Sequence, residues 1–151
     1  MKDAPETTLI LKRSFKAPVD IVYAAWTDPA QFVQWMGPNT EVMCEVIEHD
    51  VRVGGRYAFS ITNLEGKVHA ARGAFRDVRE NERLVFTWTW DHMPETETLV
   101  TVEFRDNDGT TNLLLTHERH ASAESRDNHG GGWTGALDKL ERLVARTAGG
   151  N

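Results

Sequence analysis

The fold is decided by the stretch His129-Gly130-Gly131-Gly132-Trp133-Thr134-Gly135-Ala136-Leu137-Asp138-Lys139-Leu140-Glu141-Arg142-Leu143-Val144 near the C-terminus. Its apolar residues recur at spacings of three and four, which places them on one face of a helix: Trp133, Ala136, Leu137, Leu140, Leu143 and Val144. Charged residues occupy the opposite face: Asp138, Glu141, Arg142 and Arg146. A helix with one apolar face must bury it against another layer, and most of the chain before it alternates as antiparallel strands do. The stretch therefore predicts a curved sheet packed on this one helix.

The three consecutive glycines Gly130, Gly131 and Gly132 leave the start of this helix open. Each glycine costs a helix interior about 1 kcal/mol relative to alanine. One interpretation is a loop that precedes the helix. The other places the glycines within the helix, where the missing side chains allow close packing or leave room for a ligand.

A chain of 151 residues is long enough for one domain with its own hydrophobic core. We expect this domain to span residues 7–147, with residues 1–6 and 148–151 as flexible termini. No apolar run approaches the roughly 20 residues that span a bilayer, and the first residues lack the apolar segment of a signal peptide. We therefore expect a cytoplasmic protein, a monomer or a homodimer, with no membrane partner.

The charge balance argues against nucleic acid as a partner. Lys and Arg total 17 against 23 Asp and Glu, which gives a formal net charge of -6. Nucleic-acid binding depends largely on Lys and Arg that neutralise phosphates. The run from Arg72 to Arg83 is interrupted by acidic residues, so we interpret it as a solvated strand and turn.

The rest of the chain predicts two short helices and a run of strands. Thr7 to Phe15 alternates as a first strand does. Pro18 then opens one helix, and Asp28-Pro29 supplies an N-cap and a first-turn proline for a second. From Thr40 to Glu118 apolar residues alternate over five or six strands, one of them with a bulge at Gly73, and turns are expected at 53–56, 63–66, 81–82 and 106–109. Strands joined by tight turns, with the helices kept apart, define an α+β domain with an antiparallel sheet.

Several short motifs occur in a fixed order: Phe15-Lys16-Ala17-Pro18, Trp26-Thr27-Asp28-Pro29, Phe32 to Trp35, Val53-Gly54-Gly55-Arg56-Tyr57, Leu84-Val85-Phe86-Thr87-Trp88, Thr110 to His117, and Gly132-Trp133 to Leu140. Together they cover about Thr8 to Ala145. The set resembles the START-related, Bet v 1-like (SRPBCC) superfamily, and within it the bacterial homologues of the C-terminal domain of the activator of heat-shock-protein-90 ATPase.

This resemblance implies the helix-grip fold, in which a six- to seven-stranded antiparallel sheet wraps around a long C-terminal helix and leaves a cavity between them. Two short helices follow the first strand. The resemblance also implies that the last helix begins near Ser122 to Ser125 and runs through the glycines. No catalytic motif defines the family, so the resemblance carries over no catalytic residue.

A set of aromatic side chains is predicted to face one interior. Core packing is the simpler interpretation, and a ligand cavity walled by aromatics is the alternative that the implied fold favours. We predict that a small hydrophobic or aromatic molecule binds between sheet and helix, without a cofactor. The predicted lining residues are Trp35, Phe59, Trp88, Trp90, His117, Trp133 and Leu137.

Histidines near the end of the last strand suggest other chemistry. His117, His120 and His129 could converge on a metal, but the first two are three residues apart at a strand end, which is not the zinc-binding helical pattern. We therefore predict no metal site. His117 is the best placed proton-transfer group and a weak catalytic candidate, although a hydrogen-bonded core histidine is the simpler interpretation. Cys44 lies in an apolar alternation and is interpreted as a small buried residue.

Two further functions remain open. The resemblance suggests a chaperone regulator of heat-shock protein 90 or another stress-response interaction protein, yet the known activator has two domains and this chain has the length of only the second. The same superfamily contains cyclases, aromatases and hydrolases that use the cavity for catalysis. The sequence favours a binding protein over an enzyme.

Overall fold

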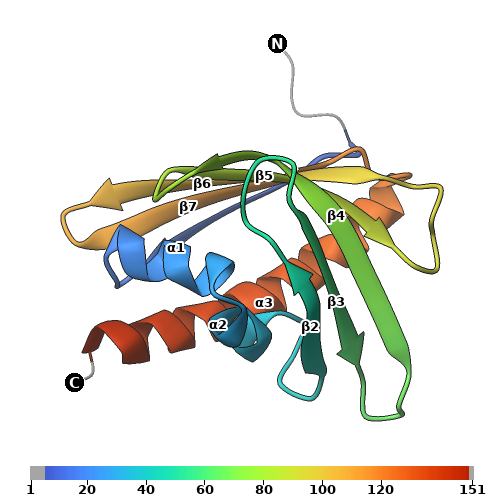
Figure 1. The fold of residues 1–151 in the computed structure, drawn as a ribbon, viewed down its shortest axis with the longest axis horizontal. Coiled ribbons are helices and arrows are strands. Elements are labelled where there is room, and N and C mark those ends of the chain that lie inside the picture. The colour runs from blue at the N-terminus through green and yellow to red at the C-terminus, as the bar shows by residue number, and fades with distance from the viewer. Residues whose placement is uncertain (1–5, 150–151) are drawn as a thin grey trace.

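The computed structural model describes residues 6–149, which form a seven-stranded antiparallel sheet and three helices. The elements follow one another as β1 (Leu9–Phe15), α1 (Val19–Thr27), α2 (Pro29–Trp35), β2 (Met43–His49), β3 (Arg56–Thr62), β4 (Val68–Arg79), β5 (Arg83–Trp90), β6 (Thr98–Asn107), β7 (Thr110–Glu118) and α3 (Ala123–Gly149). The strand order is β1-β7-β6-β5-β4-β3-β2, so β1 and β2 form the two edges. Figure 1 shows the curved sheet lying across α3, with α1 and α2 on the same side. The predicted α+β helix-grip fold is confirmed.

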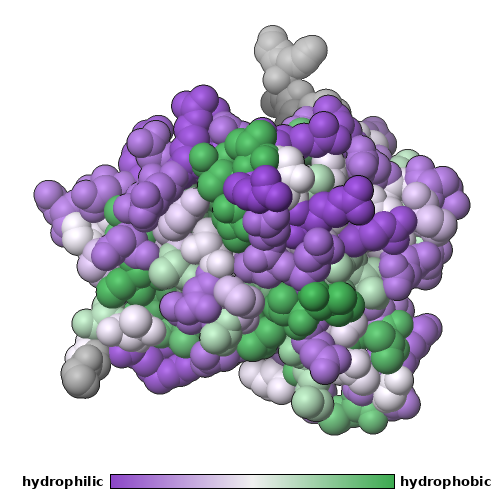
Figure 2. Space-filling model, in the orientation of Figure 1, coloured by the Kyte–Doolittle hydropathy of each residue, from purple (hydrophilic) through white to green (hydrophobic). Residues whose placement is uncertain are grey.

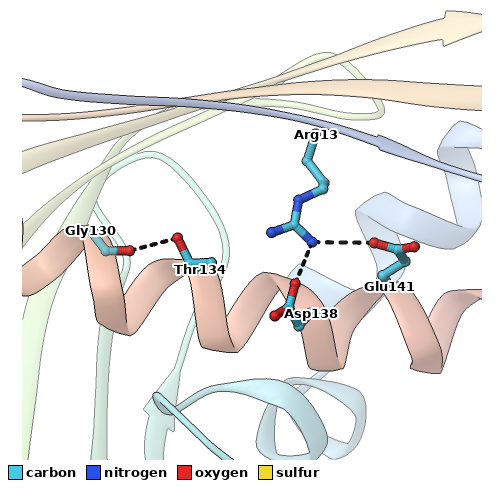
Figure 3. Close-up of polar contacts among 5 residues, drawn as sticks. All are labelled: Arg13, Gly130, Thr134, Asp138 and Glu141. Atoms are coloured by element: carbon cyan, nitrogen blue, oxygen red, sulfur yellow. Dashed lines mark hydrogen bonds and ion pairs between the residues drawn. The ribbon is translucent and has the colours of Figure 1, made fainter.

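The apolar face of α3 is buried as its spacing predicts. Trp133, Ala136, Leu137, Leu140, Leu143 and Val144 are all buried in the common core. On the neighbouring face, Arg13 of β1 reaches the helix and contacts Asp138 at 2.9 Å and Glu141 at 3.2 Å (Figure 3). Because these carboxylates are about half exposed, the ion pairs contribute at most about 1 kcal/mol. Burial of the apolar face is therefore what holds α3 against the sheet.

The helix α3 begins at Ala123, so all three glycines lie within it. The hydroxyl of Ser122 accepts a hydrogen bond from the amide of Ser125 at 3.1 Å, as an N-cap residue does. The hydroxyl of Thr134 donates to the carbonyl of Gly130 at 2.8 Å, a side-chain contact across one turn of the helix (Figure 3). The loop interpretation is wrong, and the helix start implied by the family resemblance is confirmed.

A fourth glycine, Gly135, is the one that packing requires. A Cβ at this position would lie 1.8 Å from the carbonyl oxygen of Pro38, in the segment between α2 and β2. A Cβ at Gly131 would meet nothing within 4 Å, and one at Gly132 would only touch Pro38 at 4.0 Å. The close approach of helix and loop thus occurs at Gly135, one turn after the glycine run.

The helices α1 and α2 are joined at Asp28, which caps the second of them as predicted. Its carboxylate accepts a hydrogen bond from the amide of Ala30 at 3.0 Å, and Pro29 follows at the first position of α2. The ring of Trp35 at the end of α2 is fully buried against Trp26, with ring centroids 4.6 Å apart. The two short helices therefore close one end of the core beside α3.

The bulge expected at Gly73 is not there. The pairing of β4 with β5 shifts register between Phe75 and Asp77, two residues further on. Gly73 has a different role, because a Cβ there would lie 1.9 Å from the carbonyl oxygen of Thr87 on β5. The glycine marks a close backbone approach between strands.

The ends of the domain differ slightly from the expected boundaries. The helix α3 continues to Gly149, two residues past the expected limit at 147. The flexibility expected for residues 1–5 and 150–151 falls outside the described residues. Between residues 6 and 149, no helix is long and apolar enough to cross a membrane.

Candidate functional site

A cavity of about 790 Å³ lies between the N-terminal half of α3, the strands β3 to β5 and the segment that follows α2. The walls are mostly apolar, and the β5–β6 loop contributes His92 and Met93 to them. The lining residues are Met36, Gly37, Pro38, Asn39, Val42, Ile61, Asn63, His69, Trp88, Trp90, His92, Met93, Ser122, Glu124, Ser125, Asn128, His129, Gly132, Trp133 and Ala136. We refer to this space as the main cavity.

Three of the seven predicted lining residues border the main cavity: Trp88 and Trp90 of β5, and Trp133 of α3. The alternation of β5 predicted that its aromatic residues share an environment, and the helical spacing placed Trp133 on the inner face of α3. These indoles supply the aromatic walls of the site. One of the predicted glycines, Gly132, also lies on the wall.

The other four predicted lining residues, Trp35, Phe59, His117 and Leu137, do not border the main cavity. Trp35 packs under Trp26 and donates its indole N–H to the carbonyl of Ala25 at 2.9 Å. Phe59 borders a second cavity of about 20 Å³ deeper in the core. Leu137 is buried in the contact between helix and sheet, and His117 lies behind Trp133. All four face the interior, but other side chains separate them from the main cavity.

His117 is completely buried at the centre of a hydrogen-bonded chain. Its Nδ1 accepts a hydrogen bond from the indole N–H of Trp133 at 3.0 Å. The proton must then sit on Nε2, which donates to the hydroxyl of Thr98 at 2.7 Å, and that hydroxyl donates to the carbonyl of Trp88 at 3.0 Å. Burial, followed by the neighbouring imidazoles of His120 and His129, holds the pKa of His117 well below its usual value. The side chain is a neutral support for Trp133.

A second bond of the same kind fixes Trp90. Its indole N–H donates to Nε2 of His129 at 2.9 Å, and Nδ1 of His129 donates to the carbonyl of Ser125 at 2.8 Å. Burial is the main cause that lowers the pKa of His129. Two tryptophans of the cavity wall are thus each held by a neutral histidine. Trp133 of α3 donates to a histidine of the sheet, and Trp90 of the sheet donates to a histidine of α3.

The three histidines singled out in the sequence do converge. The ring of His120 lies 4.2 Å from that of His117 and 4.6 Å from that of His129, measured between centroids. The free nitrogen lone pairs of His117 and His129 are already occupied by indole N–H groups. Among residues 6–149, no group of three or more potential ligands is arranged to hold a metal ion. The cluster is a packing and hydrogen-bonding unit.

The sequence did not point to most of the polar residues of the main cavity. His69 and His92 lie on its wall with ring centroids 5.2 Å apart, and Asn63 and Glu124 also line it. The hairpin turn at 63–66 could have placed His69, because that turn pairs it with Ile61 across β3 and β4. No sequence pattern indicates that Met36 and Pro38 fold over the cavity, because they belong to an irregular segment.

The fold and the cavity together define a helix-grip protein with a cavity between its sheet and its closing helix. Residues 16–145 match the model of the family described as Activator of Hsp90 ATPase homolog 1-like protein, and the chain belongs to that family. The comparison with curated proteins gives no match.

Solved structures show the same architecture. Protein CV1439 from Chromobacterium violaceum is 29% identical, with a TM-score of 0.85 over 91% of this chain and 97% of that chain. The AHSA1 protein from Silicibacter pomeroyi is 26% identical, with a TM-score of 0.80 over 91% and 97% of the two chains. Protein Ms6760 from Mycobacterium smegmatis is 25% identical, with a TM-score of 0.78 over 94% and 93%. The likeness extends over nearly the whole chain in each case.

Proposed function

We propose that the chain binds a small hydrophobic or aromatic molecule in the main cavity. The observation that carries this proposal is a space of about 790 Å³ walled by Trp88, Trp90 and Trp133, with several polar side chains also on its lining. Small-molecule sites are typically clefts of roughly 300–1,000 Å³ with apolar and aromatic walls and a few polar groups. The family membership is consistent with this role.

The histidine contacts support a binding role, because they order the walls before a ligand arrives. A hydrogen bond to a neutral imidazole restricts the rotation of the indole rings of Trp90 and Trp133. A site whose side chains are already fixed avoids much of the entropic cost of ordering them on binding. We therefore assign His117 and His129 to positioning the walls.

An enzymatic role has less support. Both nitrogens of His117 are engaged in bonds, and the residue does not border the main cavity. Cys44 is half-buried, and burial raises the pKa of its thiol to about 11, so it is protonated at neutral pH. His117, the proton-transfer candidate of the sequence, and Cys44, the cysteine of the chain, are thus both poorly suited to catalysis.

The binding proposal is tested with a matched pair of helix variants, Gly132→Leu and Gly131→Leu. Both replace a glycine within α3, so both gain helix propensity. Only Gly132 lines the main cavity, whereas Gly131 is exposed with open space around it. With 2-acetylnaphthalene as the probe and tryptophan fluorescence as the readout, we expect Gly132→Leu to weaken binding at least tenfold. Gly131→Leu should bind like the wild type. Equal binding by all three proteins would contradict the proposal.

A second candidate function, contact with a protein partner such as a chaperone, is favoured by an exposed apolar patch. Met43, Leu64 and Val68 are 76%, 72% and 58% exposed. They lie near one another because Met43 and Val68 both pair with Thr62, from either side of β3. Figure 2 shows hydrophobic surface at the end of the β3–β4 hairpin, within a largely polar surface. Co-elution with a heat-shock-protein-90 chaperone that is lost in Val68→Lys would support this role, and no co-elution would remove it.

A further inference from the structure

The three indoles on the wall of the main cavity differ in whether their N–H groups have a hydrogen-bond acceptor. Trp90 and Trp133 donate their N–H groups to His129 and His117. The indole N–H of Trp88 is buried and has no acceptor among the described residues. Buried polar groups in proteins are paired with protein, water or a ligand in nearly all cases. Among these three tryptophans, Trp88 is therefore the one whose N–H donor has no acceptor in the described part of the chain.

Trp88 also stands between two spaces. It borders the main cavity and the deeper cavity of about 20 Å³, and so does Met36. The deeper cavity is bordered as well by Trp26, whose indole N–H likewise lacks an acceptor among the described residues. A space of this size holds about one water molecule or one small polar group. Because methionine is flexible, a shift of Met36 would join the deeper cavity to the main one.

The charges around the main cavity limit what can enter. Its described lining contains no Lys or Arg, and its one carboxylate is Glu124. Lys139 is not part of this lining; its ammonium group lies close to Gly37 and donates to the carbonyl of Asn39 at 2.7 Å. An anionic ligand would therefore lose hydration against a wall that itself carries no Lys or Arg.

We propose that the ligand is an uncharged aromatic molecule with a hydrogen-bond acceptor, such as a ketone, ester or quinone oxygen, and that the indole N–H of Trp88 receives this oxygen. The inference rests on the proposed function and names the chemical class of its ligand. The aromatic body lies against Trp90 and Trp133, and the oxygen points toward the deeper cavity past Met36. Binding then pairs a buried donor that has no partner among residues 6–149.

The test uses two probes of nearly the same shape. 2-Acetylnaphthalene carries a carbonyl, and 2-isopropenylnaphthalene carries a carbon–carbon double bond in its place. We expect the wild type to bind the ketone about tenfold more tightly than the alkene, a ratio equivalent to about 1.4 kcal/mol. A third probe, 2-naphthoate, should bind more weakly than the ketone because of its charge.

The variant Trp88→Phe keeps an aromatic ring and removes the N–H donor. It should bind the two neutral probes equally, so the alkene serves as the internal control for any change in the shape of the wall. A ketone preference that persists in this variant would overturn the inference, as would equal binding of both probes by the wild type. Failure of every probe to bind would instead overturn the proposed function itself.

A second measurement does not depend on the folding of the variant. The five tryptophans give five indole N–H resonances in the wild type. We expect the N–H resonance of Trp88 to move downfield with the ketone and not with the alkene, because only the ketone accepts its hydrogen. An unmoved Trp88 resonance in the presence of bound ketone would contradict the inference, and would place the oxygen elsewhere in the cavity.

Discussion

At the scale of single residues, the site depends on imidazoles that are held neutral. His117 and His129 each accept one indole N–H and donate their own N–H to an oxygen, so their hydrogen-bonding capacity is fully used. His120 touches both rings, yet its two nitrogens are buried without a partner among the described residues. Three similar side chains in one cluster therefore have different energetic roles.

This difference predicts opposite effects for two matched variants. His117→Phe leaves the N–H of Trp133 buried and unpaired, which should lower the free energy of unfolding by about 1–3 kcal/mol. His120→Phe removes ring nitrogens that have no hydrogen-bond partner within residues 6–149, and it should be neutral or stabilising. Urea denaturation at pH 7.5 measures both. A larger loss in His120→Phe than in His117→Phe would show that the hydrogen bonds are not the source of stability here.

The cluster also predicts how stability depends on pH. Burial lowers the pKa of all three imidazoles, and lowers that of His120 to about 4. The unfolded chain, with imidazole pKa values of about 6.5, therefore binds more protons than the folded one below that pH. The contribution of these imidazoles to the free energy of unfolding should be complete above pH 6.5 and should decrease as the pH falls from 6.5 toward 4.

Asp and Glu side chains also take up protons as the pH falls. Comparison of the wild type with His120→Phe isolates the contribution of imidazole protonation from theirs. Each protein is denatured with urea at several pH values between 7.5 and 4.5. The variant should lose less stability over this range, because it has one fewer imidazole to protonate. Parallel curves for the two proteins would argue against a contribution from His120.

At the scale of elements, the glycines of α3 divide into those that packing requires and those that it does not. Gly131→Ala fills open space and should raise the free energy of unfolding by about 0.5–1 kcal/mol. Gly135→Ala places a methyl group against the carbonyl of Pro38 and should be destabilising by more than that gain, because the backbone must move. Chemical denaturation of the two variants against the wild type is the measurement. Stabilisation by both substitutions would mean that the segment around Pro38 moves away from α3 at little energetic cost.

Periodicity predicted the elements well, because each strand and helix exposes one face and buries the other. It also placed Trp88 and Trp133 in the interior, and Trp90 partly buried against the same core. It could not separate them from Trp35 and Phe59, because residues on the same inner face can lie against a cavity or under another side chain. Whether an inner residue borders the cavity depends on α2 and on the irregular segment around Pro38. The irregular segment has no periodic pattern that would predict its position.

At the scale of the whole molecule, the cavity exists because the helix meets the curved sheet unevenly. The C-terminal half of α3 packs on the core through Leu137, Leu140 and Val144, all buried. Its N-terminal half contributes Gly132 and Trp133 to the cavity, where the wall is completed by β3 to β5 and the segment after α2. A ligand that fills this space would add contacts between the sheet and α3, which are joined there by the Trp90–His129 hydrogen bond.

Binding should therefore stabilise the molecule as a unit. At a free concentration 100 times its Kd, a ligand adds about 2.7 kcal/mol to the free energy of unfolding. Thermal unfolding with increasing 2-acetylnaphthalene should show a rising Tm in the wild type and in Gly131→Leu. The rise should be much smaller in Gly132→Leu, and an equal rise in all three would place the probe outside the main cavity.

The most direct test of the central claim is a titration of the wild type with 2-acetylnaphthalene, followed through its indole N–H resonances. If the cavity between α3 and the sheet is the binding site, the resonances of Trp88, Trp90 and Trp133 should shift saturably. The resonance of Trp35, which does not border the cavity and is bonded to Ala25, should stay in place. Resonances that do not move at saturating probe, or a shift of Trp35 without shifts of the three cavity tryptophans, would contradict binding in the main cavity.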